Sequence, residues 1–412
     1  MAHYPAQSGS DDSFLSRIVD VFLMNDIAPL LILISLLGGA IALYVTPREE
    51  EPQIVVPLAD VIVDAPGLPV DEVERLVSTP LEKLLHQIDG VEYVYSMSHP
   101  GRAIITVRFY VGEDREDSLV KIYNKIDSNL DLVPPAVTSW VVKPLEIDDV
   151  PILIVSLWSD RPDEIDDFGL RRIAEEVEIE LQSVPQTNRV HVVGGRPRAI
   201  RVELDAEALA GRQISALEVA DALRVSNTRA RAGTYDRVDT WTPVDVGDLL
   251  RTPQELRELV VGVVDGTPVM LDDVAEAADG PPEASVYSWI GFGPAESDRA
   301  LAPGEFQPAV HIAVAKQKGA NAVHVAHAVE DRLAEIEATL LPEGAHLRIT
   351  RNYGETADHK VDELVEGLLV AIVIVIGLIA LTLGWRESLV VAVAVPITFS
   401  LVLLLNYLAG YT

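Results

Sequence analysis

The sequence predicts an α+β membrane protein in which apolar helices flank two ferredoxin-like βαββαβ units, the second of them interrupted by an inserted α+β subdomain. Three observations support this prediction. Apolar runs occupy residues 28–45, 367–383 and 389–405, and each is close to the ~20 helical residues that cross a bilayer core. Strand and helix patterns follow the first run in the order βαββαβ. The same order begins again near residue 150, with a long insertion inside the second copy.

Composition excludes some classes of site and disfavours some partners. The 412 residues include no cysteine, so a disulfide or a thiolate metal site is excluded. The chain carries 64 acidic and 32 basic residues, a net charge of -32. Such a surface repels nucleic acid and anionic lipid. The acidity is typical of a solvated surface, and it also suits a saline habitat.

The first apolar run is predicted to be an uncleaved anchor. The residues before it carry four aspartates and only Arg17 as a basic residue, which is a poor n-region for a signal peptide. Arg386, in the turn between the last two runs, favours a cytoplasmic turn. The prediction is therefore a cytoplasmic segment at 1–26 and transmembrane helices at 27–46, 364–383 and 388–410, with the large domain outside.

The first βαββαβ unit follows from local patterns. Residues 54–65 are rich in β-branched side chains and end at Pro66-Gly67, which predicts a strand and a turn. Apolar side chains then recur at helical spacing from Val70 to Ile88. The remaining predicted elements of the unit are strands at 91–97 and 103–111, a helix at 114–130 and a strand at 138–145.

The second unit and its insertion are predicted in the same way. The second unit is predicted to contain strands at 150–158, 189–193, 309–316 and 346–351. Its predicted helices are at 162–181 and 320–340. The insertion contains a predicted strand at 199–204 and a helix at 215–225. Residues 233–247 are rich in turn residues and poor in apolar ones, which favours an extended, protruding hairpin or loop.

Several short motifs carry a family resemblance. They lie in both units, in the insertion and in the last two apolar runs: Pro66-Gly67, Thr79-Pro80-Leu81-Glu82, Ile88-Asp89-Gly90-Val91, Pro134-Pro135, Val190–Gly195, Leu271–Ala275, Gly319–Ala322, Trp385-Arg386 and Ala394-Val395-Pro396. Together they resemble the N-terminal portion of a resistance–nodulation–division (RND) efflux permease of the hydrophobe/amphiphile or heavy-metal type. The resemblance covers nearly all of the chain after about residue 25.

The resemblance implies a division of the chain into named subdomains. Residues 47–135 would be the first porter subdomain, and residues 136–185 with 285–352 the second. Residues 186–284 would be the docking subdomain, with a protruding loop at about 230–250. The remaining spans and the second half of such a permease would be absent from this chain, which is then expected to be a truncated fragment.

The resemblance also implies how such a protein works. RND permeases are multi-pass homotrimers of the bacterial inner membrane with large periplasmic domains. They act with a periplasmic adaptor and an outer-membrane channel, and they exchange substrate for protons. The chain is accordingly expected to be a secondary active transporter and not an enzyme, with no cofactor, no metal and no nucleic-acid partner. The family's proton relay lies in later spans, so no residue here is assigned to it.

The substrate-lining candidates lie on two strands of the second unit. By resemblance these are Ile152, Ile154, His191 and Val193. Multidrug members place phenylalanines in this pocket, so the aliphatic residues leave the substrate unassigned among drug-like, amphiphilic and ionic compounds. The chain has only four methionines, which argues against a path for soft metal ions.

Other polar residues are predicted to be structural. His324 and His327 are expected to be surface histidines, and Glu366 to lie at the membrane interface. Asn406 and Pro396 are expected to serve helix packing. Asp148-Asp149 and Asp272-Asp273 are typical of turns and strand ends, and Gly291-Phe292-Gly293 lacks the setting of a dinucleotide loop.

Two alternatives to an efflux permease remain open. The chain could be a membrane-tethered docking or adaptor module without transport activity. It could also be a lipid- or protein-export relative within the RND superfamily, which shares the arrangement of span, domain and span. The doubled porter unit with its docking insertion favours efflux over that relative.

Overall fold

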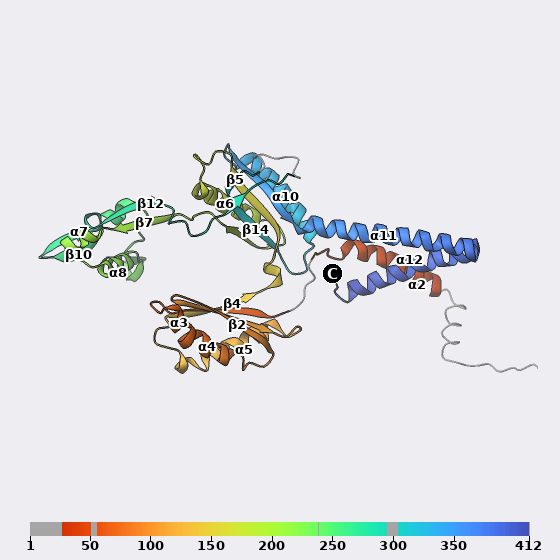
Figure 1. Cartoon of the computed structure of the whole chain (residues 1–412), viewed down its shortest axis with the longest axis horizontal. Helices are drawn as coiled ribbons and strands as arrows, with labels where there is room; N and C mark the ends of the chain where they lie inside the picture. Colours follow the sequence, from red (N-terminus) through yellow and green to blue (C-terminus); the bar gives the residue numbers. More distant parts are fainter. Residues whose placement is uncertain (1–26, 51–55, 238, 295–303, 412) are drawn as a thin grey trace, which may run out of the picture.

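The computed structural model describes residues 27–50, 56–237, 239–294 and 304–411, so the predicted cytoplasmic segment 1–26 lies outside the described residues. Three apolar helices lie together at one end of the molecule, and the α/β units lie at the other (Figure 1). The helices are α2 (Ile27–Val45), α11 (Tyr353–Thr382) and α12 (Trp385–Leu408). By length and composition α11 and α12 could each cross a membrane, whereas Pro29–Val45 forms a shorter apolar helix. Mixed helix and strand content is therefore confirmed, and placement in a membrane stays a prediction.

The first unit is a four-stranded antiparallel sheet with helices on one face. Its strands lie in the order β2-β3-β1-β4, which is the order of the split βαβ fold. A core of β1 and β3 side chains, including Val61, Ile105 and Phe109, packs against Leu85 and Ile122 of the helices. The elements are β1 (Leu58–Asp64), α3 (Val70–Val73), the π-helical turn η1 (Glu74–Ser78), α4 (Thr79–Leu85), β2 (Val91–His99), β3 (Arg102–Phe109), α5 (Arg115–Asp127), η2 (Leu130–Leu132) and β4 (Ser139–Leu145).

The second unit repeats this topology. Its sheet has the order β6-β14-β5-β15, again antiparallel throughout, and the short strand β13 pairs with the start of β14. Helix α6 begins at Asp167 and not at the predicted residue 162, because the Asp166 side chain caps the helix by accepting from Gly169 N at 2.9 Å. The elements are β5 (Pro151–Ser159), α6 (Asp167–Gln182), β6 (Thr187–Val193), β13 (Trp289–Ile290), β14 (Gln307–Lys316), α10 (Ala322–Thr339) and β15 (Ala345–Asn352).

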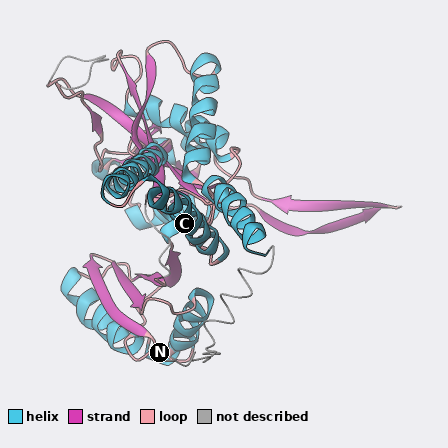
Figure 2. Cartoon of the chain, turned by 90° about the vertical axis from the view of Figure 1, so that its right-hand side faces the viewer, coloured by secondary structure: helices cyan, strands magenta, loops and turns pink. Residues whose placement is uncertain are grey.

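The insertion leaves the second unit after β6, so this sheet extends past the boundary that the sequence places at residue 185. It has its own small core, around Val219, Leu271 and Ala277. Within it, the residues of the β8–β9 hairpin are exposed, and Figure 2 shows a long two-stranded hairpin standing clear of the other elements. The elements are β7 (Ala199–Leu204), α7 (Ala206–Gly211), α8 (Ala216–Ser226), β8 (Ala230–Arg237), β9 (Thr240–Val246), α9 (Pro253–Arg257), β10 (Val260–Val264), β11 (Thr267–Met270) and β12 (Ala275–Gly280).

The apolar helices pack through small residues. Ser35 Oγ of α2 donates to the Ile397 carbonyl of α12 at 3.0 Å. A Cβ added at Gly39 would lie 2.4 Å from Ser400 Cβ, so only glycine allows this approach. Between α11 and α12, Gly384 adopts a φ of 116°, which favours glycine in the turn. Small residues at such crossings let helix backbones approach closely.

A short linker ties α2 to the second unit. Glu49 Oε1 lies 2.9 Å from Lys316 Nζ of β14, and both side chains are buried, with 3% and 8% exposed. Arg48 pairs with Asp358 of α11, and its carbonyl accepts from Ala322 N of α10 at 3.1 Å. This linker, residues 48–50, therefore contacts a strand and two helices that lie far along the sequence. The linker therefore connects the apolar helices rigidly to the second sheet.

The buried ion pair generates a first prediction. Lys316→Met alone or Glu49→Leu alone should destabilise the chain by roughly 3–5 kcal/mol, because each leaves one buried charge unpaired. The double variant should lose less stability than the two single variants lose together. Urea unfolding of the detergent-solubilised chain, followed by circular dichroism, measures all three. Lys318→Met, at an exposed neighbouring lysine, is the matched control, and additive losses would contradict the pairing.

The helix crossing generates a second prediction. Gly39→Val should destabilise the chain by about 1–3 kcal/mol, since the added methyl groups overlap Ser400 of α12. Gly377→Val is the control, because a Cβ at Gly377 of α11 meets no atom within 4 Å. The midpoint of thermal unfolding in detergent compares them. Equal effects of the two substitutions would show that the stability contributed by α2 does not depend on its close approach to α12 at Gly39.

Candidate functional site on the outer face of the second sheet

The second sheet has one face packed against helices and one that is only partly covered. Successive side chains of a strand point to opposite faces. Leu153, Val155 and Leu157 of β5, with Ile312 and Val314 of β14, belong to the core that α6 and α10 complete. The alternate residues form the other face. This outer face is defined here by Ile154, Ser156, Trp158, His191, Val193, His311, Ala313, His346 and Thr350.

Three of the four predicted substrate-lining residues lie together on the outer face. Ile154 of β5 and His191 of β6 both pair with Ala313 of the strand between them. Val193 pairs with His311 and is 46% exposed. Ile152 differs, because the register of β5 against β14 shifts beside it and its side chain joins the core with 7% exposed. Whether any of the four contacts a substrate stays a prediction.

A short polar network crosses the outer face from β14 to β15. The Ser156 hydroxyl lies 2.8 Å from His311 Nδ1 and 3.0 Å from Thr350 Oγ1. Thr350 Oγ1 in turn donates to the Ile154 carbonyl at 3.2 Å. Because Ser156 is fully buried, its pairing with His311 does not make an accessible nucleophile with a base. The network instead holds a histidine ring in a fixed position among aliphatic side chains.

Both histidines on β6 and β14 are biased toward the neutral form. Burial lowers the pKa of His311. Burial, and secondarily the charge of Arg189, lowers the pKa of His191. Within the described residues, the buried Nδ1 of His191 has no hydrogen-bond partner. A neutral imidazole can donate one hydrogen bond and accept another, so these two rings add polar groups but no charge to the outer face.

An aromatic cluster lies at one end of the outer face. Trp158 is 2% exposed and stacks on His346, with ring centroids 4.7 Å apart. Phe292 meets the Trp158 ring edge-on at 5.9 Å. Phe292 is the aromatic residue of the Gly291-Phe292-Gly293 motif. This cluster was not predicted from the sequence, although Trp158 lies four residues after Ile154 on β5 and so shares its face of the strand.

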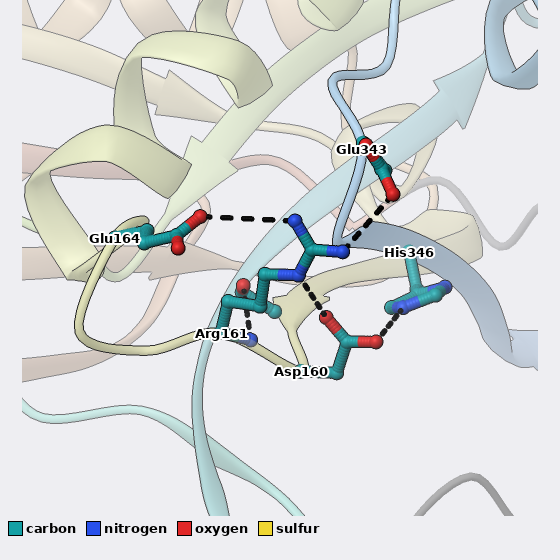
Figure 3. Close-up of polar contacts among 6 residues, drawn as sticks. Asp160, Arg161, Glu164, Glu343 and His346 are labelled. Carbon is teal, nitrogen blue, oxygen red and sulfur yellow. Dashed lines mark hydrogen bonds and ion pairs between the residues drawn. The ribbon is translucent and has the colours of Figure 1, made fainter.

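An exposed network of charges adjoins this cluster (Figure 3). Arg161, just after β5, lies 3.0 Å from Glu343, 3.8 Å from Glu164 and 4.0 Å from Asp160. Its hydrogen bond to Glu343, together with the nearby acidic charges, raises the pKa of Arg161. Asp160 also lies 3.2 Å from His346 Nε2. These groups are largely exposed, so the network adds little stability.

The remaining polar candidates take part in hydrogen bonds and ion pairs. His327 Nδ1 lies 3.1 Å from Glu330, whose other oxygen accepts from Asn352. No group of three or more potential ligands occurs in the described part of the chain. Asp273 pairs with Arg212 at 3.0 Å, and Asp149 accepts from the Glu146 amide.

The residues singled out in the apolar helices are placed as follows. Glu366 is exposed in α11, and Asn406 is exposed in α12. Pro396 lies inside α12, in the turn that precedes Ile397, the residue whose carbonyl accepts from Ser35.

The lowered pKa of His311 generates a prediction on acid stability. An unfolded histidine titrates near 6.5. Below that pH, His311 therefore binds a proton more readily in the unfolded chain than in the folded chain. Stability should therefore fall as the pH drops from 7 to 5. His311→Gln should reduce this loss, measured as the shift of the unfolding midpoint with pH, while His359→Gln, at an exposed histidine of α11, should not. An unchanged acid loss in His311→Gln would contradict the assignment.

Comparison with known proteins gives consistent matches along the chain. A model described as the AcrB/AcrD/AcrF family matches residues 18–412. Multidrug resistance protein MdtC of Yersinia pseudotuberculosis serotype O:1b (strain IP 31758) is 27% identical over 397 residues. MdtC of Yersinia pestis bv. Antiqua (strain Angola) is 27% identical over the same length. The matched region is 95% of this chain and 37% of each relative, so the chain spans well under half of their length.

Proposed function

The chain belongs to the AcrB/AcrD/AcrF family of RND efflux permeases, and on that premise we propose that it handles substrate in a proton-driven pump of the inner membrane. Its outer face would bind the exported compound on the periplasmic side. The pump would be a homotrimer that works with a periplasmic adaptor and an outer-membrane channel. The proton relay would lie outside these 412 residues, since the family places it in later spans.

The observation that carries this proposal is the connection between the outer face and the apolar helices. Linker residues 48–50 join α2 to β14 and α11, and β14 carries His311 on the outer face. Helix α11 follows β15 directly, so the second sheet is attached to the helices on two sides. A transporter needs such attachments, because movement in the membrane must alter the substrate site.

The chemistry of the outer face supports an amphiphilic substrate. Aliphatic side chains, two histidines with lowered pKa values and an aromatic cluster offer van der Waals contact with few hydrogen bonds. Such surfaces bind apolar groups of varied shape. The printed name of the relatives, multidrug resistance protein, agrees with a broad substrate range, and we extend that range to this chain only as part of the proposal.

A non-transporting adaptor is the main alternative. The same two porter units could act as a tethered interaction module, and a lipid- or protein-export relative would share the layout. The linker contacts favour transport, because a passive tether has no need of a buried ion pair between the linker that follows an apolar helix and a sheet. Transport measurements separate these possibilities.

Transport tests the proposal directly. Proteoliposomes that carry the permease containing this chain should move the uncharged dye Nile red when a pH gradient is imposed, and not without one. Val193→Asp, on the outer face, should reduce the initial rate by about tenfold, because a charge placed against an apolar ligand must be desolvated. Val263→Asp, at a 66% exposed residue of the insertion, is the matched control.

Each outcome of the transport measurement decides a part of the proposal. Transport that is equal with and without the gradient would overturn proton antiport. Absence of transport would favour the adaptor module. Equal rates for Val193→Asp and Val263→Asp would remove the outer face from the substrate path.

A further inference from the structure

The first unit contains a hollow that the proposed function does not use. It lies on the helical side of the first sheet, between η1, α4 and α5, and has a volume of about 90 Å³. Val61 and Trp140 of the sheet lie at its base, Leu81 and Ile126 of the helices form its sides, and Pro134 of the loop after η2 bounds it. It is a cavity in a different unit from the outer face.

The walls of this cavity carry almost no polar groups. Asn129 is the one residue with a polar side-chain amide among those that line it, and its Nδ2 already donates to the Lys125 carbonyl at 2.8 Å. No ionisable side chain is among the described residues that line the cavity. A charged ligand would therefore lose its hydration without gaining a partner. The chemistry of the walls restricts the occupant to an uncharged, apolar molecule.

Local backbone geometry explains why the cavity is not filled. The helix that forms one wall changes from α to π over Glu74–Ser78, and Leu76 and Val77 of this turn line the cavity. A π turn widens the helix and is frequent at functional sites. On the opposite side η2 ends before Val133 and Pro134, and Leu132 remains 66% exposed at the rim.

The dimensions and shape of the cavity favour a single ring. A closed apolar cavity of about 150 Å³ stays dry and holds benzene. The present cavity of about 90 Å³ is smaller, but it is partly open, so that one ring can enter with an edge at the surface. The planar Trp140 indole and the rings of Pro80 and Pro134 are among its walls, and flat walls pack well against a flat ligand.

We propose that this cavity is a binding site for a small uncharged aromatic molecule of one ring. The site is separate from the outer face of the second sheet, and it does not depend on the transport proposed above. Occupancy would link η1 and α4 to the segment 132–137, which leads into β4. A ligand there would therefore stabilise the helical layer of the first unit against its sheet.

Fluorine NMR of the 412-residue chain in lipid nanodiscs tests the proposal, with benzene as the probe. The chain has five tryptophans, so labelling with 5-fluorotryptophan gives five signals, and Trp140→Phe identifies that of Trp140. Benzene should shift the Trp140 signal saturably. Benzoate, which has the same ring and a charge, should not. A linear shift shared with Trp385 in the apolar helices would report partition into lipid and would overturn the proposal.

Matched variants link the signal to the cavity. Val133→Phe adds a ring to the lining and should weaken benzene binding at least tenfold. Val120→Phe makes the same change at a 55% exposed position of α5 and should leave binding unchanged. Leu84→Ala enlarges the cavity and should allow the larger molecule indole to bind. This second variant tests the proposal even if Val133→Phe does not fold. Equal benzene affinity in Val133→Phe and Val120→Phe, or no indole binding by Leu84→Ala, would contradict the assignment.

Discussion

The buried ion pair between Glu49 and Lys316 is the constraint on which the arrangement of this molecule depends. Two charges removed from water are costly unless they meet each other in good geometry, and here they lie 2.9 Å apart with almost no exposure. The pair fixes the chain that leaves α2 against the last residue of β14 in the second sheet. Arg48, with its ion pair to Asp358, extends the same connection to α11. These contacts join the apolar helices to the sheet that carries the outer face.

The two ferredoxin-like units share a topology but differ in how they are connected. The second unit is held to the apolar helices by the linker and by α11, which begins directly after β15. The first unit connects to the second through the short segment between β4 and β5. Its helical layer is also shorter and is interrupted by a π turn next to a cavity. The outer face, on which Ser156 holds His311, therefore belongs to the unit that contacts the apolar helices through the linker.

Much of the fold could be predicted from sequence, because it rests on local periodicity. Alternating β-branched residues and helical apolar spacing predict both copies of the βαββαβ order, and the structure shows that order in each sheet. Contacts between distant residues could not be predicted in this way. The pairing of Glu49 with Lys316 joins residues 267 positions apart, and no local pattern relates them. The register shift that turns Ile152 into the core also depends on the partner strand. The aromatic cluster needs Phe292 to return across the insertion to Trp158.

If an exported compound binds to the outer face of the second sheet, photoaffinity labelling will attach it to residues of that face. An uncharged amphiphile carrying a diazirine would be irradiated with the membrane-embedded protein, and the modified peptides would be identified by mass spectrometry. Labels are expected on β5, β6 and β14 at outer-face residues such as Val193 and His311, and excess unlabelled amphiphile should reduce them. Labels confined to the insertion or to the first unit would contradict binding at the outer face.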